Sequence, residues 1–223
     1  ASELYIGLMS GTSLDGIDAG LVDFSDGKIR LVDFLYTPFP DKLRQRINAI
    51  SQSDQPVLLK DYGHLDSELG ICFAQAAISL LKKSKHSHDQ IIAIGSHGQT
   101  VYHEPNHRHG FSLQIGDPNR IAQLTGITTI ADFRRRDIAA QGQGAPLVPA
   151  FHHAVFFDSQ CPRAIVNIGG IANITVLNER PIQGFDTGPG NTLLDSWHQR
   201  HRHQAYDANG AWAGSGEIHQ PLL

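Results

Sequence analysis

Residues 4–24 read LYIGLMSGTSLDGIDAGLVDF, two apolar runs joined by a turn of Gly, Ser, Thr and Asp. The runs at 4–8 and 17–24 are typical of β-strands, and a third run at 28–36 follows Ser25-Asp26-Gly27. An Asp-Gly pair between two such runs is a strong hairpin signal. The chain is therefore expected to open with an antiparallel meander of three strands.

The apolar spacing changes to a helical period after this meander. Residues 41–50 and 57–83 have that period, so they are predicted to form helices. Strands and helices then alternate, with strands predicted at 91–95 and 128–132 and helices at 117–124 and 147–157. Such an alternation is typical of an α/β protein.

The opening layout returns later in the chain. Runs at 163–168 and 171–177 flank Gly169-Gly170, a third run covers 181–185, and a helix is expected at 191–202. The shared layout favours a structural duplication, although the two segments have few identical residues. We therefore expect two related domains, at 1–145 and 146–223, with the second incomplete because the crossovers that would bury its sheet are missing.

Composition narrows the class of function. The 223 residues are 40% apolar and carry a formal charge of −4, which excludes wholesale disorder and argues against nucleic acid as a partner. No apolar stretch approaches the roughly 18 residues of a membrane span, and the N-terminus has no signal-peptide pattern. Cys72 and Cys161 are too few and too far apart to suggest a disulfide framework. We expect a cytoplasmic protein that recognises small molecules, with neither nucleic acid nor membrane as a partner.

The first glycine-rich turn, MSGTSLDGID at 9–18, has the chemistry of an anion site. Gly11 and Gly16 allow the backbone to approach a ligand closely, and the N–H groups of the turn can form a nest for phosphate. Asp15 and Asp18 are suited to hold a hydrated Mg²⁺ against phosphate oxygens. The spacing matches neither a Walker A loop nor a dinucleotide fingerprint, and an ordinary polar hairpin loop would use the same residues.

A second turn at 167–173 repeats this layout without charge, and the stretch GFDTGPGN at 184–191 follows it. Asp186 is predicted to end a strand just before a Gly-Pro-Gly turn, with Asn191 as the cap of the next helix. A carboxylate in that position suits a general base. The alternative is an aspartate that only satisfies the amides of the turn.

Two further polar clusters follow predicted strands, where α/β proteins place ligand-binding residues. The first contains His97, Gln99 and Thr100; the second, DFRRRD at 132–137, contains arginines that suit a carboxylate or a phosphate. The alternative for the second cluster is a solvated charge run paired internally with its own aspartates. The 13 histidines include no HExxH motif, so metal binding by histidine is not expected.

Taken in order, six stretches are similar to the anhydro-N-acetylmuramic acid kinase family: MSGTSLDGID, SHGQTVYH, LQIGDPNRIAQLTGI, ADFRRRDIAAQGQGAPLVPAFH, NIGGIANIT and GFDTGPGN. The resemblance implies the sugar kinase, heat-shock protein 70 and actin superfamily, with two ribonuclease-H-like domains around an ATP cleft. It also implies that 1,6-anhydro-N-acetylmuramic acid, ATP and water become N-acetylmuramic acid 6-phosphate and ADP in peptidoglycan recycling. The alternatives are a non-catalytic sugar- or nucleotide-binding fragment of such a kinase, and a metal-dependent hydrolase that uses the histidines.

The resemblance assigns roles residue by residue. It implies that Asp186 is the base that activates water, that Asp15 or Asp18 holds Mg²⁺, and that the protein is a homodimer. The residues implied to lie on the ATP phosphates are Gly11, Thr12, Ser13, Leu14, Asp15, Gly16, Ile17, Asp18, Gly169 and Gly170. Those expected on the sugar side are His97, Gln99, Thr100, Arg134, Arg135, Gly188 and Asn191, an arginine fork being suited to the lactyl carboxylate.

Overall fold

The computed structural model describes residues 2–52, 56–177 and 182–222. It shows a mixed α/β fold whose chain divides into two compact units, Ala1–Ala145 and Pro146–Leu223. In the described residues, no helix has the length and apolar character needed to cross a membrane.

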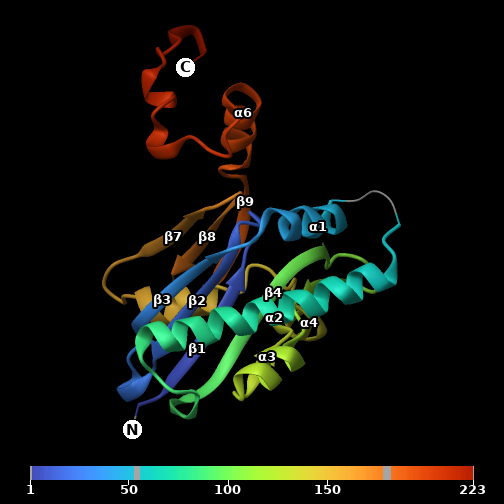
Figure 1. Cartoon of the computed structure of the whole chain (residues 1–223). Coiled ribbons are helices and arrows are strands. Elements are labelled where there is room, and N and C mark those ends of the chain that lie inside the picture. The colour runs from blue at the N-terminus through green and yellow to red at the C-terminus, as the bar shows by residue number, and fades with distance from the viewer. Residues whose placement is uncertain (1, 53–55, 178–181, 223) are drawn as a thin grey trace. The chain divides into compact units, whose positions relative to one another are not determined.

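The first unit is built on a mixed sheet (Figure 1). Its strands are β1 (Leu4–Ser10), β2 (Gly16–Asp23), β3 (Arg30–Pro38), β4 (Ile91–Glu104), β5 (Phe111–Ile115) and β6 (Thr129–Ala131). The order is β3-β2-β1-β4-β5, and β6 also pairs with β4. β1, β2 and β3 form the predicted antiparallel meander, while β4 is parallel to both β1 and β6. The hairpin partner of β4, β5, is a strand that the sequence pattern did not predict.

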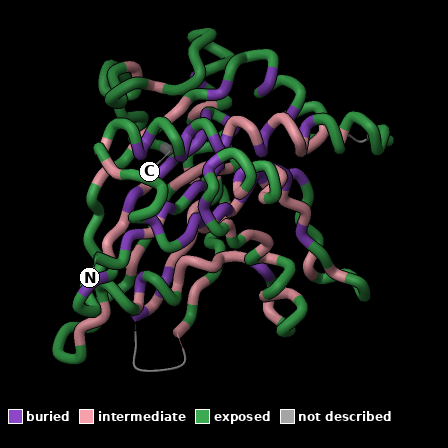
Figure 2. The backbone as a smooth tube through the Cα atoms, turned by 60° about the horizontal axis from the view of Figure 1, so that its bottom comes forward, coloured by how far each residue is buried: buried purple, intermediate pink, exposed green. Residues whose placement is uncertain are grey.

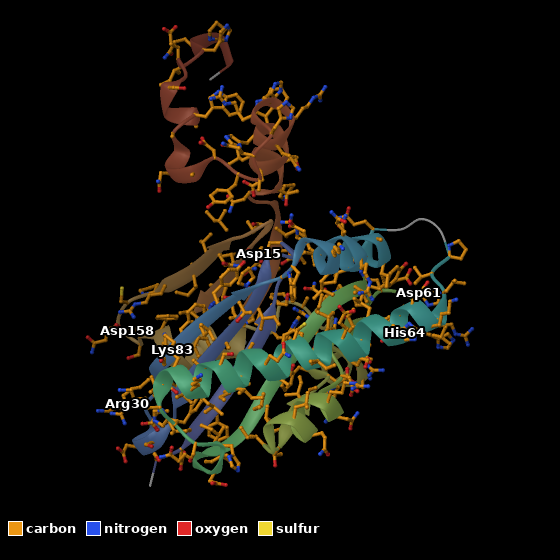
Figure 3. All side chains as sticks on the ribbon, viewed as in Figure 1. Asp15, Arg30, Asp61, His64, Lys83 and Asp158 are labelled. Carbon is orange, nitrogen blue, oxygen red and sulfur yellow. The ribbon has the colours of Figure 1, made fainter. Side chains whose placement is uncertain are left out.

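Helices pack against this sheet, and the first three of them contribute side chains to its core. They are α1 (Asp41–Ser51), α2 (Leu59–Ser84), α3 (Pro118–Thr125) and α4 (Phe133–Ala139). The long α2 crosses the sheet, and Figure 3 shows Asp61 and His64 near its start and Lys83 at its other end. Leu65, Leu69 and Phe73 of α2 are fully buried, together with alternate residues of β1. Figure 2 shows buried and exposed stretches alternating along the backbone tube.

The second unit contains a three-stranded antiparallel sheet. Its elements are α5 (Pro149–Phe156), β7 (Arg163–Ile168), β8 (Ile171–Leu177), β9 (Gln183–Pro189) and α6 (Thr192–Arg202), followed by three short 3-10 turns. The order β7-β8-β9 repeats the layout of β1-β2-β3, with Gly169 and Gly170 at the first turn. The predicted run at 181–185 begins at Pro181, which lies outside the described residues; the strand itself starts at Gln183.

The structure corrects several predicted boundaries. β4 continues to Glu104 rather than ending at 95, so His97, Gln99 and Thr100 lie within the strand and not after it. The arginine-rich stretch, for which the sequence pattern predicted no element, forms the short helix α4. Asp186 lies inside β9, because that strand continues through the predicted turn as far as Pro189.

Candidate functional site

The β1–β2 turn divides into exposed and buried residues. Thr12, Ser13 and Asp15 are exposed, and the Ser13 hydroxyl donates to the Asp15 carboxylate over 2.7 Å. Leu14 and Ile17, by contrast, belong to the hydrophobic core. These two side chains therefore anchor the turn, and only their backbone groups are available to a ligand.

Glycine is required at one position of this turn. A Cβ on Gly16 would lie 2.3 Å from the carbonyl oxygen of Thr37 and 2.9 Å from Cα of Pro38. Real Cβ atoms do not approach backbone this closely, so Gly16 lets β2 pair tightly with the end of β3. Gly11 is different: a Cβ there would meet only Ser13 Oγ, at 3.8 Å. The space beside Gly11 is thus open to an approaching group.

The environment of Asp18 disfavours its charged form. Burial raises the pKa of Asp18, and the charge of Asp15 raises it further. A divalent cation would relieve this repulsion, and Mg²⁺ commonly binds one or two carboxylates while retaining waters and phosphate oxygens. Within the described ranges, no group of three or more His, Cys, Asp or Glu side chains is arranged to hold a metal ion. Two carboxylates in this turn could hold a Mg²⁺ whose remaining ligands are waters and phosphate oxygens.

Gln99 of β4 stabilises the β1–β2 turn through buried hydrogen bonds. Its side chain is fully buried, and its Oε1 lies 2.6 Å from the Ser10 hydroxyl, which is also 2.9 Å from the carbonyl oxygen of Gly16. Its Nε2 donates to the carbonyl oxygen of Thr100. Both ends of the amide are occupied within the protein, so Gln99 ties β4 to the β1–β2 turn. Its contact with a sugar stays a prediction.

His97 and Arg134 form a direct pair. Arg134 Nε donates to His97 Nε2 over 2.8 Å, and His97 Nδ1 lies 2.8 Å from the carbonyl oxygen of Gly98. A carbonyl oxygen only accepts, so Nδ1 carries the proton and Nε2 is the acceptor, which defines a neutral imidazole. Burial lowers the pKa of His97 and the Arg134 charge lowers it further, against a raising effect of the Gly98 bond. Two of the predicted sugar-side residues are thus brought together, with the histidine orienting the guanidinium.

Arg135 pairs with an aspartate of its own stretch, as expected if this stretch is a charge run paired internally. Its Nε donates to Asp132 Oδ1 over 2.7 Å, and its Nη2 lies 2.6 Å from Asp132 Oδ2. Asp132 immediately precedes α4, so this two-point pair joins residues three positions apart. Asp137 also acts locally, because it accepts the N–H of Gly144 over 2.7 Å. Of the two predicted arginines, Arg134 is therefore the one linked to the other predicted sugar-side residues.

Sequence reasoning missed Gln114 of β5. Its Nε2 donates to Thr100 Oγ1 over 3.2 Å and to Ser112 Oγ over 2.6 Å. Its Oε1 is buried and has no hydrogen-bond partner in the part of the chain that the structure describes. A buried polar atom without a partner marks a place where a ligand or a water completes the bonding. The only sequence signal was its place in the stretch LQIGDPNRIAQLTGI.

In the second unit, the two predicted glycine turns are bonded to each other. The N–H groups of Gly190 and Asn191 donate to the carbonyl oxygens of Gly170 and Gly169, over 2.8 and 2.7 Å. A Cβ on Gly190 would lie only 2.2 Å from the Gly169 carbonyl oxygen, so this contact requires glycine. The structure therefore brings Gly169, Gly170 and Asn191 together.

The sequence predicts Asn191 as the cap of α6, but its side chain makes no capping hydrogen bond to the helix. It stands at the cap position, but its Nδ2 donates to the Ile168 carbonyl oxygen over 3.1 Å. Thr192 Oγ1 donates to the Gly170 carbonyl oxygen over 2.7 Å. Both side chains thus reinforce the contact between the two turns instead of the first turn of the helix.

Asp186 is exposed on β9, opposite Asn173 of β8. The register shifts just after this pair, because Ala172 is opposite Gly188 and Thr187 is the extra residue. Gly188 has φ of +125°, a conformation that side chains rarely adopt. The bulge and this glycine carry the strand past Asp186, whose carboxylate is exposed on β9.

The candidate site of this α/β protein combines two glycine-turn meanders, a buried glutamine and an exposed aspartate on a strand. The comparisons define the class more closely, since the family model described as anhydro-N-acetylmuramic acid kinase matches residues 3–223. The chain belongs to this family.

Its relatives support the same assignment. Proteins named anhydro-N-acetylmuramic acid kinase from Shewanella loihica and Shewanella woodyi are 56% and 52% identical to it, over 98% and 100% of this chain. The chain spans 60% and 61% of the length of these two curated relatives. Among solved structures, the Aquifex aeolicus PPX-GPPA enzyme matches with a TM-score of 0.43 and 6% identity, over 88% of this chain and 56% of that one.

Proposed function

We propose that this chain takes part in an ATP-dependent kinase reaction that opens 1,6-anhydro-N-acetylmuramic acid and phosphorylates its O6. The observation that carries this proposal is the family match across residues 3–223, together with relatives of that name at 49–56% identity. The products are N-acetylmuramic acid 6-phosphate and ADP. We further propose, from the family resemblance, that the reaction serves peptidoglycan recycling in the cytoplasm and that the protein is a homodimer.

The proposal includes a fold assignment for both units. We assign each to the ribonuclease-H-like type found in actin-like ATPases. In unit 1 the assignment is supported by the β1-β2-β3 meander followed by the parallel strands β4 and β6. In unit 2 it is supported by the repeated meander β7-β8-β9.

For ATP, the proposed phosphate site is the β1–β2 turn, from Gly11 to Asp18. The open space at Gly11 and the exposed hydroxyls of Thr12 and Ser13 suit phosphate oxygens. Asp15 and Asp18 would hold Mg²⁺, which when bound supplies positive charge that stabilises the transferring phosphoryl group. Gly169 and Gly170 are proposed as the corresponding turn of unit 2.

For the sugar, Arg134 is the proposed anchor of the lactyl carboxylate. His97 accepts its Nε–H and Gly144 accepts from its Nη1, which fixes the plane of the guanidinium. A guanidinium held in one plane binds a carboxylate with good geometry. Thr100, Gly188 and Asn191 remain proposed as further sugar-side positions, and Gln114 joins them through its bond to Thr100.

The proposed chemistry needs one base. Asp186 takes a proton from a water molecule whose oxygen bonds to C1 of the sugar while the C1–O6 bond breaks. The electron pair of that bond goes to O6, which then bonds to the γ-phosphorus of ATP as ADP leaves. An exposed carboxylate on a strand has the access to water that this step requires.

The test is turnover of the anhydro-sugar by this chain in the presence of ATP and Mg²⁺. Mass spectrometry should detect a sugar 6-phosphate and ADP in equal amounts. Asp186→Asn should reduce turnover by about 10²–10⁴-fold, the usual contribution of a general base, while ATP binding measured by calorimetry stays within about twofold, a difference of about 0.4 kcal/mol. Loss of binding and turnover together would contradict the assignment of Asp186.

A further inference from the structure

One buried hydroxyl joins the two strands that flank the β1–β2 turn. Ser10 is the last residue of β1 and Gly16 is the first of β2, and Ser10 Oγ lies 2.9 Å from the Gly16 carbonyl oxygen. It also lies 2.6 Å from Gln99 Oε1 on β4. Both oxygens can only accept, so the hydroxyl proton is shared between them. Ser10 is 1% exposed, so this hydroxyl acts within the protein rather than on a ligand.

The Ser10 bond also determines where a carbonyl oxygen of the turn points. The carbonyl oxygen of Asp15 accepts the N–H of Phe39 over 2.9 Å, and that of Gly16 accepts from the buried hydroxyl of Ser10. Carbonyl oxygens carry partial negative charge and repel an anion, whereas backbone N–H groups attract it. The Ser10 bond thus keeps the Gly16 carbonyl oxygen turned into the protein and away from a phosphate at the turn.

Gly16 depends on this bond more than its neighbours do. Leu14 and Ile17 are anchored by side chains in the core, whereas Gly16 has no side chain, and a Cβ there would overlap the backbone of β3. Glycine also has greater backbone freedom than other residues. The Ser10 bond therefore fixes the orientation of a peptide group that has no side chain to anchor it.

We propose that Ser10 is a positioning residue for the phosphates of ATP: its hydroxyl holds the Gly16 carbonyl oxygen inside the protein and leaves the N–H groups of the turn to face the anion. This inference rests on the proposed function, in which the β1–β2 turn binds those phosphates. Ser10 touches neither substrate and acts through Gly16. Its contact with Gln99 holds the hydroxyl in place from the side of β4.

The first test measures phosphate binding without turnover. The probes are ATP and inorganic tripolyphosphate, each with Mg²⁺, and calorimetry gives both affinities; tripolyphosphate has three linked phosphates and no adenosine. Ser10→Ala should weaken both by about tenfold, which corresponds to about 1.4 kcal/mol, while Ser10→Thr keeps a hydroxyl and should stay within about threefold of the wild type. A loss confined to ATP would place the effect outside the phosphate turn and overturn the proposal.

Thr125→Val is the matched control for stability. Thr125 of α3 also has a buried hydroxyl with two hydrogen bonds, since its Oγ1 lies 2.7 Å from the Ile121 carbonyl oxygen and 3.2 Å from the Ile127 nitrogen. Thermal unfolding should show that Ser10→Ala and Thr125→Val both destabilise the protein, whereas only Ser10→Ala should weaken phosphate binding. Equal affinities in these two variants would reduce Ser10 to a structural role.

A second measurement uses the wild type alone. The NMR signal of the Gly16 carbonyl carbon should stay constant as tripolyphosphate is added, because the bond to Ser10 persists, while the amide signals of Thr12 and Ser13 should shift. A large shift of the Gly16 carbonyl signal would overturn the proposal. If the wild type binds neither probe, the proposed function fails at its phosphate site and this inference fails with it. Wild-type binding that Ser10→Ala retains in full removes the inference alone.

Discussion

At the scale of single residues, the candidate site depends on side chains whose partners fix both their direction and their protonation state. His97 shows this most directly. It donates through Nδ1 to the Gly98 carbonyl oxygen and accepts through Nε2 from Arg134. Protonation would turn Nε2 into a donor facing another donor. The neutral imidazole is therefore part of the structure that aims the guanidinium of Arg134.

A pH dependence of stability follows from this pair. Burial, and after it the Arg134 charge, lower the folded-state pKa of His97 below its ordinary value of 6.5. The unfolded chain therefore binds this proton more tightly, so the stabilisation is present above the ordinary pKa and is lost as the pH falls through the folded-state pKa. The wild type should lose more thermal stability between about pH 7.5 and about pH 5 than His97→Gln, which keeps an acceptor but does not titrate. An equal fall in melting temperature over this pH range in the two proteins would contradict this explanation.

At the scale of elements, the β1–β2 turn is held by close packing rather than by its own polar residues. Gly16 lies against the backbone of Thr37 and Pro38, and Leu14 and Ile17 are anchored in the core. Ser10 and Gln99 connect the same turn to β4. The open groups of the turn are thus presented on a rigid support.

Gly16→Ala should destabilise the protein by about 2–3 kcal/mol, because its Cβ would overlap a backbone oxygen. Gly7→Ala is the matched control on β1, where a Cβ would meet nothing within 4 Å; its effect should stay within about 0.5 kcal/mol. Chemical denaturation of the three proteins measures the difference. A Gly16 variant as stable as the Gly7 variant would show that the close approach at the turn is not required.

The elements with a clear local pattern were predictable, and those defined by distant partners were not. The first meander and the helix α2 follow from alternation and helical spacing. The extension of β4 beyond residue 95 is polar in sequence, but Gln99 and Thr100 are satisfied by Ser10 and Gln114, which lie far away in the chain. The sequence of α4 has no apolar period that would predict a helix. Its arginines bond instead to His97 and Asp132.

The same distinction applies to the candidate site. The residue types of the glycine turns and the motif around Asp186 could be selected from sequence, because glycine and exposed carboxylates stand out locally. The burial of individual polar side chains could not be predicted from sequence. Gln99, for example, has the sequence context of a ligand contact but is fully buried in the structure. The opposition of Asn173 and Asp186 depends on a bulge at Thr187, which no local pattern specifies.

At the scale of the whole molecule, the described core is concentrated in unit 1. All buried hydrophobic residues of the described ranges lie there except Leu177. Apolar burial is the dominant favourable contribution to folding, so the two units should differ in local stability.

Amide hydrogen exchange measures this difference. Amide protons of β1, β2 and β4 should exchange about 100-fold more slowly than those of β7, β8 and β9. The comparison uses backbone amides that are hydrogen-bonded within each sheet, so that solvent exposure of unpaired groups does not enter. Equal protection across the two sheets would show that the units open together.

In the proposed reaction, water activated by Asp186 opens the anhydro-sugar as O6 receives the phosphoryl group. The most direct measurement is turnover with ATP and Mg²⁺ in ¹⁸O-labelled water, with mass spectrometry of the sugar 6-phosphate before ring-opening exchange scrambles the label. The account predicts one ¹⁸O at C1 in the earliest product. A phosphorylated sugar without label at C1 would contradict it.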